Sequence, residues 1–168
     1  MEQSTLSKPE FKKKQISFTG TSTPTNNPEE KGTTIKLPNG KTLVIESIVE
    51  WYDKATDWRV TGKSFYHSNS LTEEDGLKAE IWGKGEIIVD GEKPGDKSRG
   101  KWELSWFGKI IPKEEPPYNE KSPFTIIGEG VGSGIEGEVK GLVAKWIYTF
   151  DSDLGYFYNF KGFIQEKD

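Results

Sequence analysis

Glycine recurs at almost every second position between Gly128 and Gly141, where the chain reads Gly-Glu-Gly-Val-Gly-Ser-Gly-Ile-Glu-Gly-Glu-Val-Lys-Gly. Successive side chains on a strand point to opposite faces, so this spacing leaves one face of a strand bare. A bare backbone bends sharply and approaches other surfaces closely. A sheet that turns corners needs such positions, and the segment therefore favours a closed antiparallel β-barrel.

Short alternating segments divided by turn residues fill the chain from Ile35 onward. In the clearest of them Trp102, Leu104 and Trp106 share one face, a period of two residues that is typical of a half-buried strand. Strands are expected at residues 43–52, 58–67, 77–89, 101–111, 124–128, 134–143, 145–150 and 156–164, with polar turns or loops at 53–57, 71–76, 90–100, 112–123 and 151–155. Seven to nine antiparallel strands predict an all-β fold, a closed barrel of about eight strands.

A chain of 168 residues fits one domain. Residues 1–34 are rich in Ser, Thr, Lys, Pro and Asn, which predicts a flexible N-terminal arm with a short strand around residues 15–20. Residues 35–168 are expected to form the single barrel domain. Only 32% of the chain is hydrophobic, but 12% is aromatic, and large rings supply the buried area of the core.

The charge pattern argues against polyanionic partners. The net charge is −4 with both signs interspersed, and no basic patch stands out beyond Lys12, Lys13 and Lys14, so nucleic acid is not an expected partner. No stretch approaches eighteen apolar residues, and the first residues carry no apolar signal segment. We therefore expect a cytoplasmic protein that does not bind membranes.

The chain has no cysteine, which excludes disulfides, thiolate catalysis and zinc sites with cysteine ligands. It contains no His-x-His, His-Glu-x-x-His or calcium-loop pattern, so no metal is predicted. The glycine run lacks the Gly-Lys-Ser/Thr ending of a phosphate-binding loop and a following helix. No cofactor is expected.

The glycine run and the aromatic segment 156–164 together resemble the allene oxide cyclase and dirigent barrel superfamily. In that family a Gly-Gly-Ser-Gly-Ile-like stretch and a Gly-x-Val-Lys sequence precede a closing strand rich in Phe and Tyr. The matching residues are Gly130, Gly132, Ser133, Gly134, Ile135, Glu136, Gly137, Val139 and Lys140. Glu50 takes the place of a glutamate on the family's early strand, although Tyr52 stands where the family has Asn. The resemblance implies an allene oxide cyclase-like barrel, with a lipocalin-like barrel as the alternative.

Large rings on shared strand faces are the candidate walls of an interior cavity. They are Trp51, Trp58, Trp102, Trp106, Tyr156, Tyr158 and Phe160. A small antiparallel barrel binds its ligand in its lumen, and flat rings suit an apolar guest. The same rings also suit a packed core or a contact between subunits.

Three residues are predicted to be catalytic: Glu50, Tyr66 and His67. A carboxylate inside a dry barrel is costly unless it serves electrostatics or proton transfer, which favours Glu50 over a solvated position. Glu46 has the same strand parity and is the alternative acid at the substrate. Tyr66 would shape the cavity wall, and His67, the only histidine, is either a general base or a surface residue.

The leading hypothesis is a cofactor-free cyclase or isomerase that folds a reactive, largely apolar molecule, such as a polyketide, a terpenoid or an oxylipin, into its reacting shape. A second hypothesis is a carrier that binds an apolar ligand without changing it, because one cavity serves both roles. A third is a dirigent-like scaffold. Exposed rings and the family resemblance favour a homodimer or trimer.

Overall fold

The computed structural model describes residues 14–166. This part of the chain forms nine strands in one antiparallel sheet and a single 3-10 turn, η1 (Trp58–Val60). The strands are β1 (Gln15–Pro24), β2 (Thr33–Lys36), β3 (Thr42–Ala55), β4 (Gly62–Thr72), β5 (Ala79–Val89), β6 (Gly100–Pro112), β7 (Phe124–Gly137), β8 (Leu142–Asp151) and β9 (Tyr158–Glu166). The prediction of an all-β fold is confirmed. Residues 14–166 contain no helix of the length and apolarity that crossing a membrane requires.

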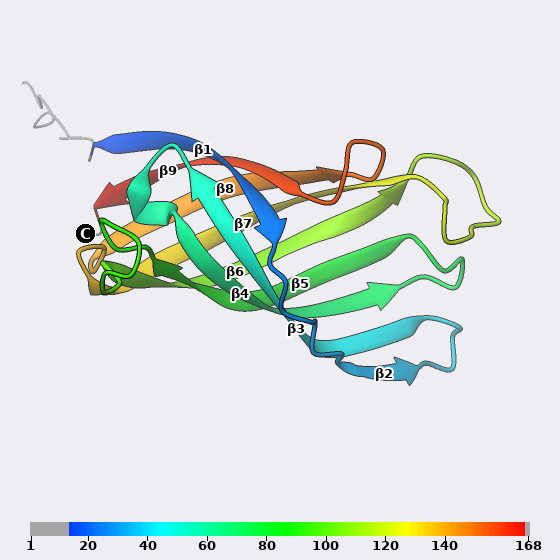
Figure 1. Ribbon diagram of the computed structural model, residues 1–168. Coiled ribbons are helices and arrows are strands. Elements are labelled where there is room, and N and C mark those ends of the chain that lie inside the picture. The colour runs from blue at the N-terminus through cyan, green and yellow to red at the C-terminus, as the bar shows by residue number, and fades with distance from the viewer. Residues whose placement is uncertain (1–13, 167–168) are drawn as a thin grey trace, which may run out of the picture.

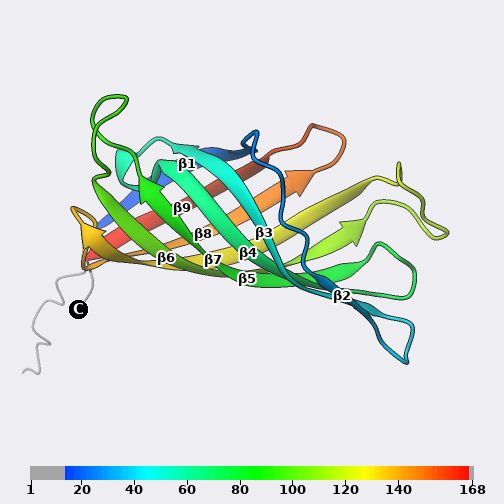
Figure 2. The same cartoon turned by 60° about the horizontal axis from the view of Figure 1, so that its bottom comes forward.

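The sheet closes on itself. Its order is β1-β9-β8-β7-β6-β5-β4-β3-β2, and β1 also pairs with β3, with Gly20 opposite Ala55 and Pro24 opposite Trp51. Because β2 pairs only with β3, the other eight strands form a continuous ring of hydrogen bonds. Figure 1 shows β1, in blue, between the red β9 and the cyan part of β3, and Figure 2 shows the β2–β3 hairpin extending beyond the ring. The expected closure through about eight strands is therefore present.

The N-terminal region differs from its expected structure. Residues 15–24, which sequence analysis assigned to a flexible arm with a short strand, form a ten-residue strand that completes the ring. Only Phe18 and Ser22 of this strand are buried. The strand therefore needs few apolar residues, and its polar composition is like that of a mobile segment. Backbone hydrogen bonds to both β9 and β3 hold this segment in a strand, although its composition alone does not favour one. Residues 1–13 of the expected arm lie outside the described residues.

The glycine run is the central part of one long strand. β7 continues from Phe124 to Gly137, where two strands were expected, and the turn comes afterwards, at residues 138–141. A Cβ on Gly128 would lie 2.3 Å from the phenol of Tyr148, and a Cβ on Gly130 would lie 2.3 Å from the indole of Trp146. Glycine is required here because rings from β8 lie directly against the β7 backbone.

The end of the ring that contains η1 is filled with apolar side chains. Val60, Val89, Trp102, Val139 and Ile164 are among the members of this buried cluster. Trp102 is fully buried, and its indole Nε1 donates a hydrogen bond of 2.7 Å to the carbonyl oxygen of Arg59 in η1. The turn between β3 and β4 is thereby fixed across this end of the ring.

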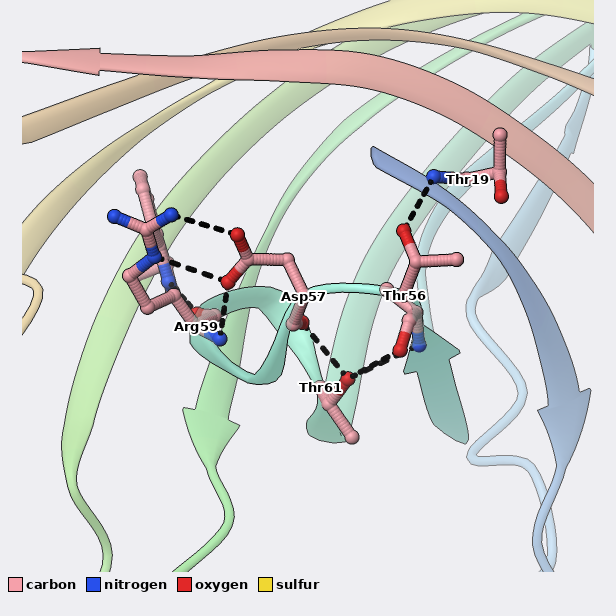
Figure 3. Close-up of polar contacts among 7 residues, drawn as sticks. Thr19, Thr56, Asp57, Arg59 and Thr61 are labelled. Atoms are coloured by element: carbon pink, nitrogen blue, oxygen red, sulfur yellow. Dashed lines mark hydrogen bonds and ion pairs between the residues drawn. The ribbon is translucent and has the colours of Figure 1, made fainter. Parts of the chain in front are cut away.

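Side chains within the same turn hold η1 in place (Figure 3). The carboxylate of Asp57 accepts hydrogen bonds from the backbone N–H, Nε and Nη2 of Arg59, at 3.0, 3.0 and 2.6 Å. The hydroxyl of Thr61 bonds the backbone of Ala55, and the hydroxyl of Thr56 accepts a bond from the N–H of Thr19 on β1. Asp57 is the N-cap of this turn, and its carboxylate satisfies the free N–H of Arg59, which is a common way to begin a turn of helix.

Candidate functional site

A cavity of about 290 Å³ lies in the interior of the ring. It is at the lower end of the volumes typical of small-molecule pockets. Glu29 and Tyr156 line it yet are exposed, Tyr156 to 68%, so these two residues mark its mouth. Glu29 precedes β2 and Tyr156 lies between β8 and β9, whereas η1 and its cluster close the other end of the ring. The cavity is therefore a pocket with one mouth.

Five rings form a belt around this cavity, here called the aromatic belt: Trp51, Tyr158, Tyr148, Trp106 and Tyr66. The centroids of successive rings are 5.3, 5.7, 6.4 and 6.3 Å apart, and each pair meets edge to face. This geometry is a favourable one for aromatic pairs. The rings come from β3, β9, β8, β6 and β4, so the belt depends on the closed order of the strands.

A buried carboxyl group, that of Asp53, lies between the two ends of the belt: it follows Trp51 by two residues on β3 and accepts a hydrogen bond from Tyr66. Asp53 of β3 is 3% exposed. Its Oδ1 accepts hydrogen bonds from the hydroxyls of Ser22, at 2.5 Å, and Ser64, at 3.0 Å. Its Oδ2 accepts a hydrogen bond of 2.8 Å from the phenol of Tyr66. Ser22 lies on β1 directly opposite Asp53, so the pairing that closes the ring also builds this site.

The surroundings shift the acidity of both groups. Burial raises the pKa of Asp53 above its usual value, although the three hydroxyl donors act in the opposite direction. Burial, together with the nearby Asp53 charge, raises the pKa of Tyr66 well above its usual value. Tyr66 therefore stays a neutral donor. A carboxylate has about four acceptor positions, so Asp53 keeps one after its three bonds and is a stronger base when ionised than an ordinary carboxylate.

Two further polar atoms in the cavity wall have no hydrogen-bond partner among the described residues. They are the Nε1 of Trp106 and the phenol oxygen of Tyr148. Both are buried, and a buried donor without a partner costs about 1–3 kcal/mol. The interior therefore carries polar groups that a core built for stability alone would not retain.

Most of the rings predicted as cavity walls do line the cavity. These are Trp51, Trp102, Trp106, Tyr156, Tyr158 and Phe160, and the cavity also includes Tyr66. Trp58 does not line it, because this residue belongs to η1 and stays 40% exposed. The guanidinium carbon of Arg99 lies 3.3 Å from the centroid of the Trp58 ring, a cation–π contact on the outside.

The three other predicted residues lie away from the cavity. Glu50 has the opposite parity to Trp51, and its carboxylate accepts hydrogen bonds from Thr25 and Asn27 at 2.6 and 2.7 Å. Glu46 is exposed, with a φ of 61°, where the register between β3 and β4 shifts. His67 is exposed on β4, next to the inward-facing Tyr66. The geometry therefore gives none of these three a contact with a molecule in the cavity.

Sequence reasoning missed Asp53, Ser22 and Ser64. Asp53 was assigned to a polar turn at residues 53–57, but β3 continues to Ala55. The available signal was parity, because Asp53 follows the inward-facing Trp51 by two residues. Among the described residues no group of three or more acidic or histidine side chains is arranged to hold a metal ion.

Comparison with known proteins gives no family assignment. The chain matches no family model, and no curated protein and no solved structure matches it. The geometry and chemistry of the cavity therefore carry the functional argument.

Proposed function

We propose that this protein is a cofactor-free isomerase or cyclase that binds a small, largely apolar molecule inside the ring. One observation carries the proposal: the buried carboxyl group of Asp53, bonded by three hydroxyls, opens onto a cavity walled by aromatic rings. Perturbed acids in clefts are typical of functional sites. The resemblance of the glycine run to the allene oxide cyclase barrels supports the same reaction class and is part of the proposal.

The proposed chemistry is proton transfer within an apolar chamber. Ionised Asp53 removes a proton from the bound molecule and returns it at another carbon. Tyr66 keeps the carboxylate oriented through its 2.8 Å hydrogen bond. The aromatic belt holds a flexible substrate in its reacting shape and excludes water, which contributes orientation. Asp53 thus takes the catalytic role that the sequence suggested for Glu50.

The Kemp elimination of 5-nitrobenzisoxazole tests whether this carboxylate acts as a base. Its C–H bond breaks as the proton passes to Asp53, the electron pair completes the nitrile, and the N–O bond breaks to leave a coloured phenolate. The reaction needs only a base in an apolar site. We expect the wild-type rate to exceed that of Asp53→Asn by about 100-fold, the ordinary contribution of a general base.

Two further variants complete this test. Tyr66→Phe should lower the rate while leaving Asp53 in place. Glu103→Gln removes one negative charge from the exposed face of β6 and should leave the rate unchanged. Circular dichroism shows whether each variant is folded. A wild-type rate equal to that of folded Asp53→Asn would contradict proton transfer by Asp53.

A carrier is the second candidate function. The observation in its favour is that three of the acceptor positions of Asp53 are already occupied by Ser22, Ser64 and Tyr66. A molecule released from the denatured protein would be identified by mass spectrometry and then incubated with fresh protein in D₂O. An isomerase incorporates deuterium into it or rearranges it, whereas a carrier returns it unlabelled and unchanged.

A further inference from the structure

The charges around the cavity all have one sign. Among the residues that the structure describes, the charged side chains that line it are those of Asp53 and Glu29. No Lys, Arg or His is among these lining residues. Asp53 also forms no ion pair with any described residue, although buried charges usually have a partner. When Asp53 is ionised, a ligand is therefore the group that can supply a positive charge beside it.

The rest of the wall suits a cation as well. Trp51 lies two residues before Asp53 on β3 and meets Tyr158 of β9 edge to face. Tyr66 on β4 donates a hydrogen bond directly to Asp53. The faces of these rings carry negative electrostatic potential, and desolvated cations bind to them favourably. The ring of Tyr156 stacks on Trp51 with the centroids 5.5 Å apart, which extends the aromatic wall to the mouth. Glu29 adds a negative charge at that mouth.

We infer that the ligand of this cavity is a small organic cation, such as a protonated or quaternary amine on an apolar skeleton, with its charge against Asp53 and its skeleton among the rings of the aromatic belt. The inference rests on the proposed function in that it assigns a ligand class to the same cavity. Anionic ligands such as fatty acids are disfavoured, because no basic side chain of the described wall would balance their carboxylate.

Burial and the ligand act on Asp53 in opposite directions. Burial alone favours the protonated carboxyl, whereas a positive charge nearby favours the carboxylate. A bound cation therefore stabilises the ionised form of Asp53. The hydroxyls of Ser22 and Ser64 support that form, since both donate to Oδ1 and leave Oδ2 to Tyr66 and the ligand.

A pair of matched probes tests the inference on the full chain. Phenyltrimethylammonium and tert-butylbenzene have nearly the same shape, and they differ in one positive charge. Binding would be measured by titration of the intrinsic tryptophan fluorescence at about pH 8, where an ordinary carboxyl is ionised. We expect the cation to bind at least about tenfold more tightly than the neutral probe.

Variants locate the effect. Asp53→Asn should remove the preference for the cation while keeping the affinity for tert-butylbenzene. Glu29→Gln should lower the affinity for the cation by a smaller factor, and Glu103→Gln on the outer face should leave that affinity unchanged. The comparison of two probes on the wild-type chain decides the question even where a variant does not fold.

Each outcome has a distinct meaning. Equal or tighter binding of tert-butylbenzene to the wild type would overturn the cationic ligand class and leave an apolar substrate for the proposed isomerase. A preference for the cation that survives in folded Asp53→Asn would also overturn it. Binding of the cation without any Kemp elimination would instead refute the proposed proton transfer and leave the cation site intact. Binding of neither probe would contradict both proposals.

Discussion

Replacing Gly130 by alanine tests why glycine recurs along β7. The new Cβ would lie 2.3 and 2.5 Å from two carbons of the Trp146 indole, whereas carbon atoms in contact are about 3.5–4.0 Å apart. The indole must therefore move by about 1 Å or more, away from a position in which it packs against both buried clusters. Overpacking of this kind costs about 1–3 kcal/mol.

A smaller effect opposes this cost. Replacing glycine by alanine restricts the unfolded chain and stabilises the folded state by about 0.4–1 kcal/mol. The net loss for Gly130→Ala should be about 1–2 kcal/mol, a decrease in Tm of about 2–8 °C for a chain of this size. Urea denaturation followed by tryptophan fluorescence measures it.

Gly132 on the same face of β7 is the matched control. Its added Cβ would come closest to the Leu104 Cδ2, at 3.0 Å, and this is the end of a flexible side chain. Gly132→Ala should therefore change the unfolding free energy by less than about 0.5 kcal/mol. Equal stability of Gly130→Ala and Gly132→Ala would refute the explanation that glycine makes room for the indole.

Other predictions concern the interior and the closed end of the ring. Since burial raises the pKa of Asp53, its contribution to stability is present at low pH and is lost as the pH rises through the folded-state pKa. Asp53→Asn should therefore become more stable relative to the wild type as the pH rises above about 4, and urea denaturation midpoints that change equally with pH in both proteins would contradict this. Trp102→Phe should lower the free energy of unfolding by about 1–3 kcal/mol, because it leaves the Arg59 carbonyl without its donor and opens a gap. The same change at the exposed Trp58 should lower it by less than about 1 kcal/mol. Thermal unfolding compares the two variants. The hydrogen bond to Asp90 and partial burial raise the pKa of Tyr52 to about 12, so Asp90→Asn should return its ultraviolet titration towards the ordinary value of 10.0.

The alternation of side chains made much of this fold predictable. Trp102, Leu104 and Trp106 point inward on β6 as their spacing of two residues indicates. The same alternation explains the position of Glu50, because the residues of β3 that line the cavity are the odd-numbered Val49, Trp51 and Asp53. Glu50 was proposed because it matches a family position and because a carboxylate inside a dry barrel points to function, and neither argument used its parity, which is opposite to that of Trp51.

The sequence indicated that the sheet closes into a ring, but it did not indicate which strands pair to close it. The sequence of β1 is polar and resembles a mobile arm, so nothing local indicates that Ser22 pairs with Asp53. Contacts between residues 31 positions apart depend on the whole sheet. The buried Asp53 site could not be predicted from the sequence for this reason, since three strands must meet before its donors surround it.

The titration of the Asp53 carboxyl carbon by carbon-13 NMR tests the central claim most directly, with the signal assigned by its loss in Asp53→Asn. We predict a midpoint above the ordinary value of 3.8, because this carboxyl is buried inside the ring. A midpoint at or below that value would mean that Asp53 is an ordinary solvated or fully stabilised carboxylate, and it would contradict the account of the cavity as a site of proton transfer.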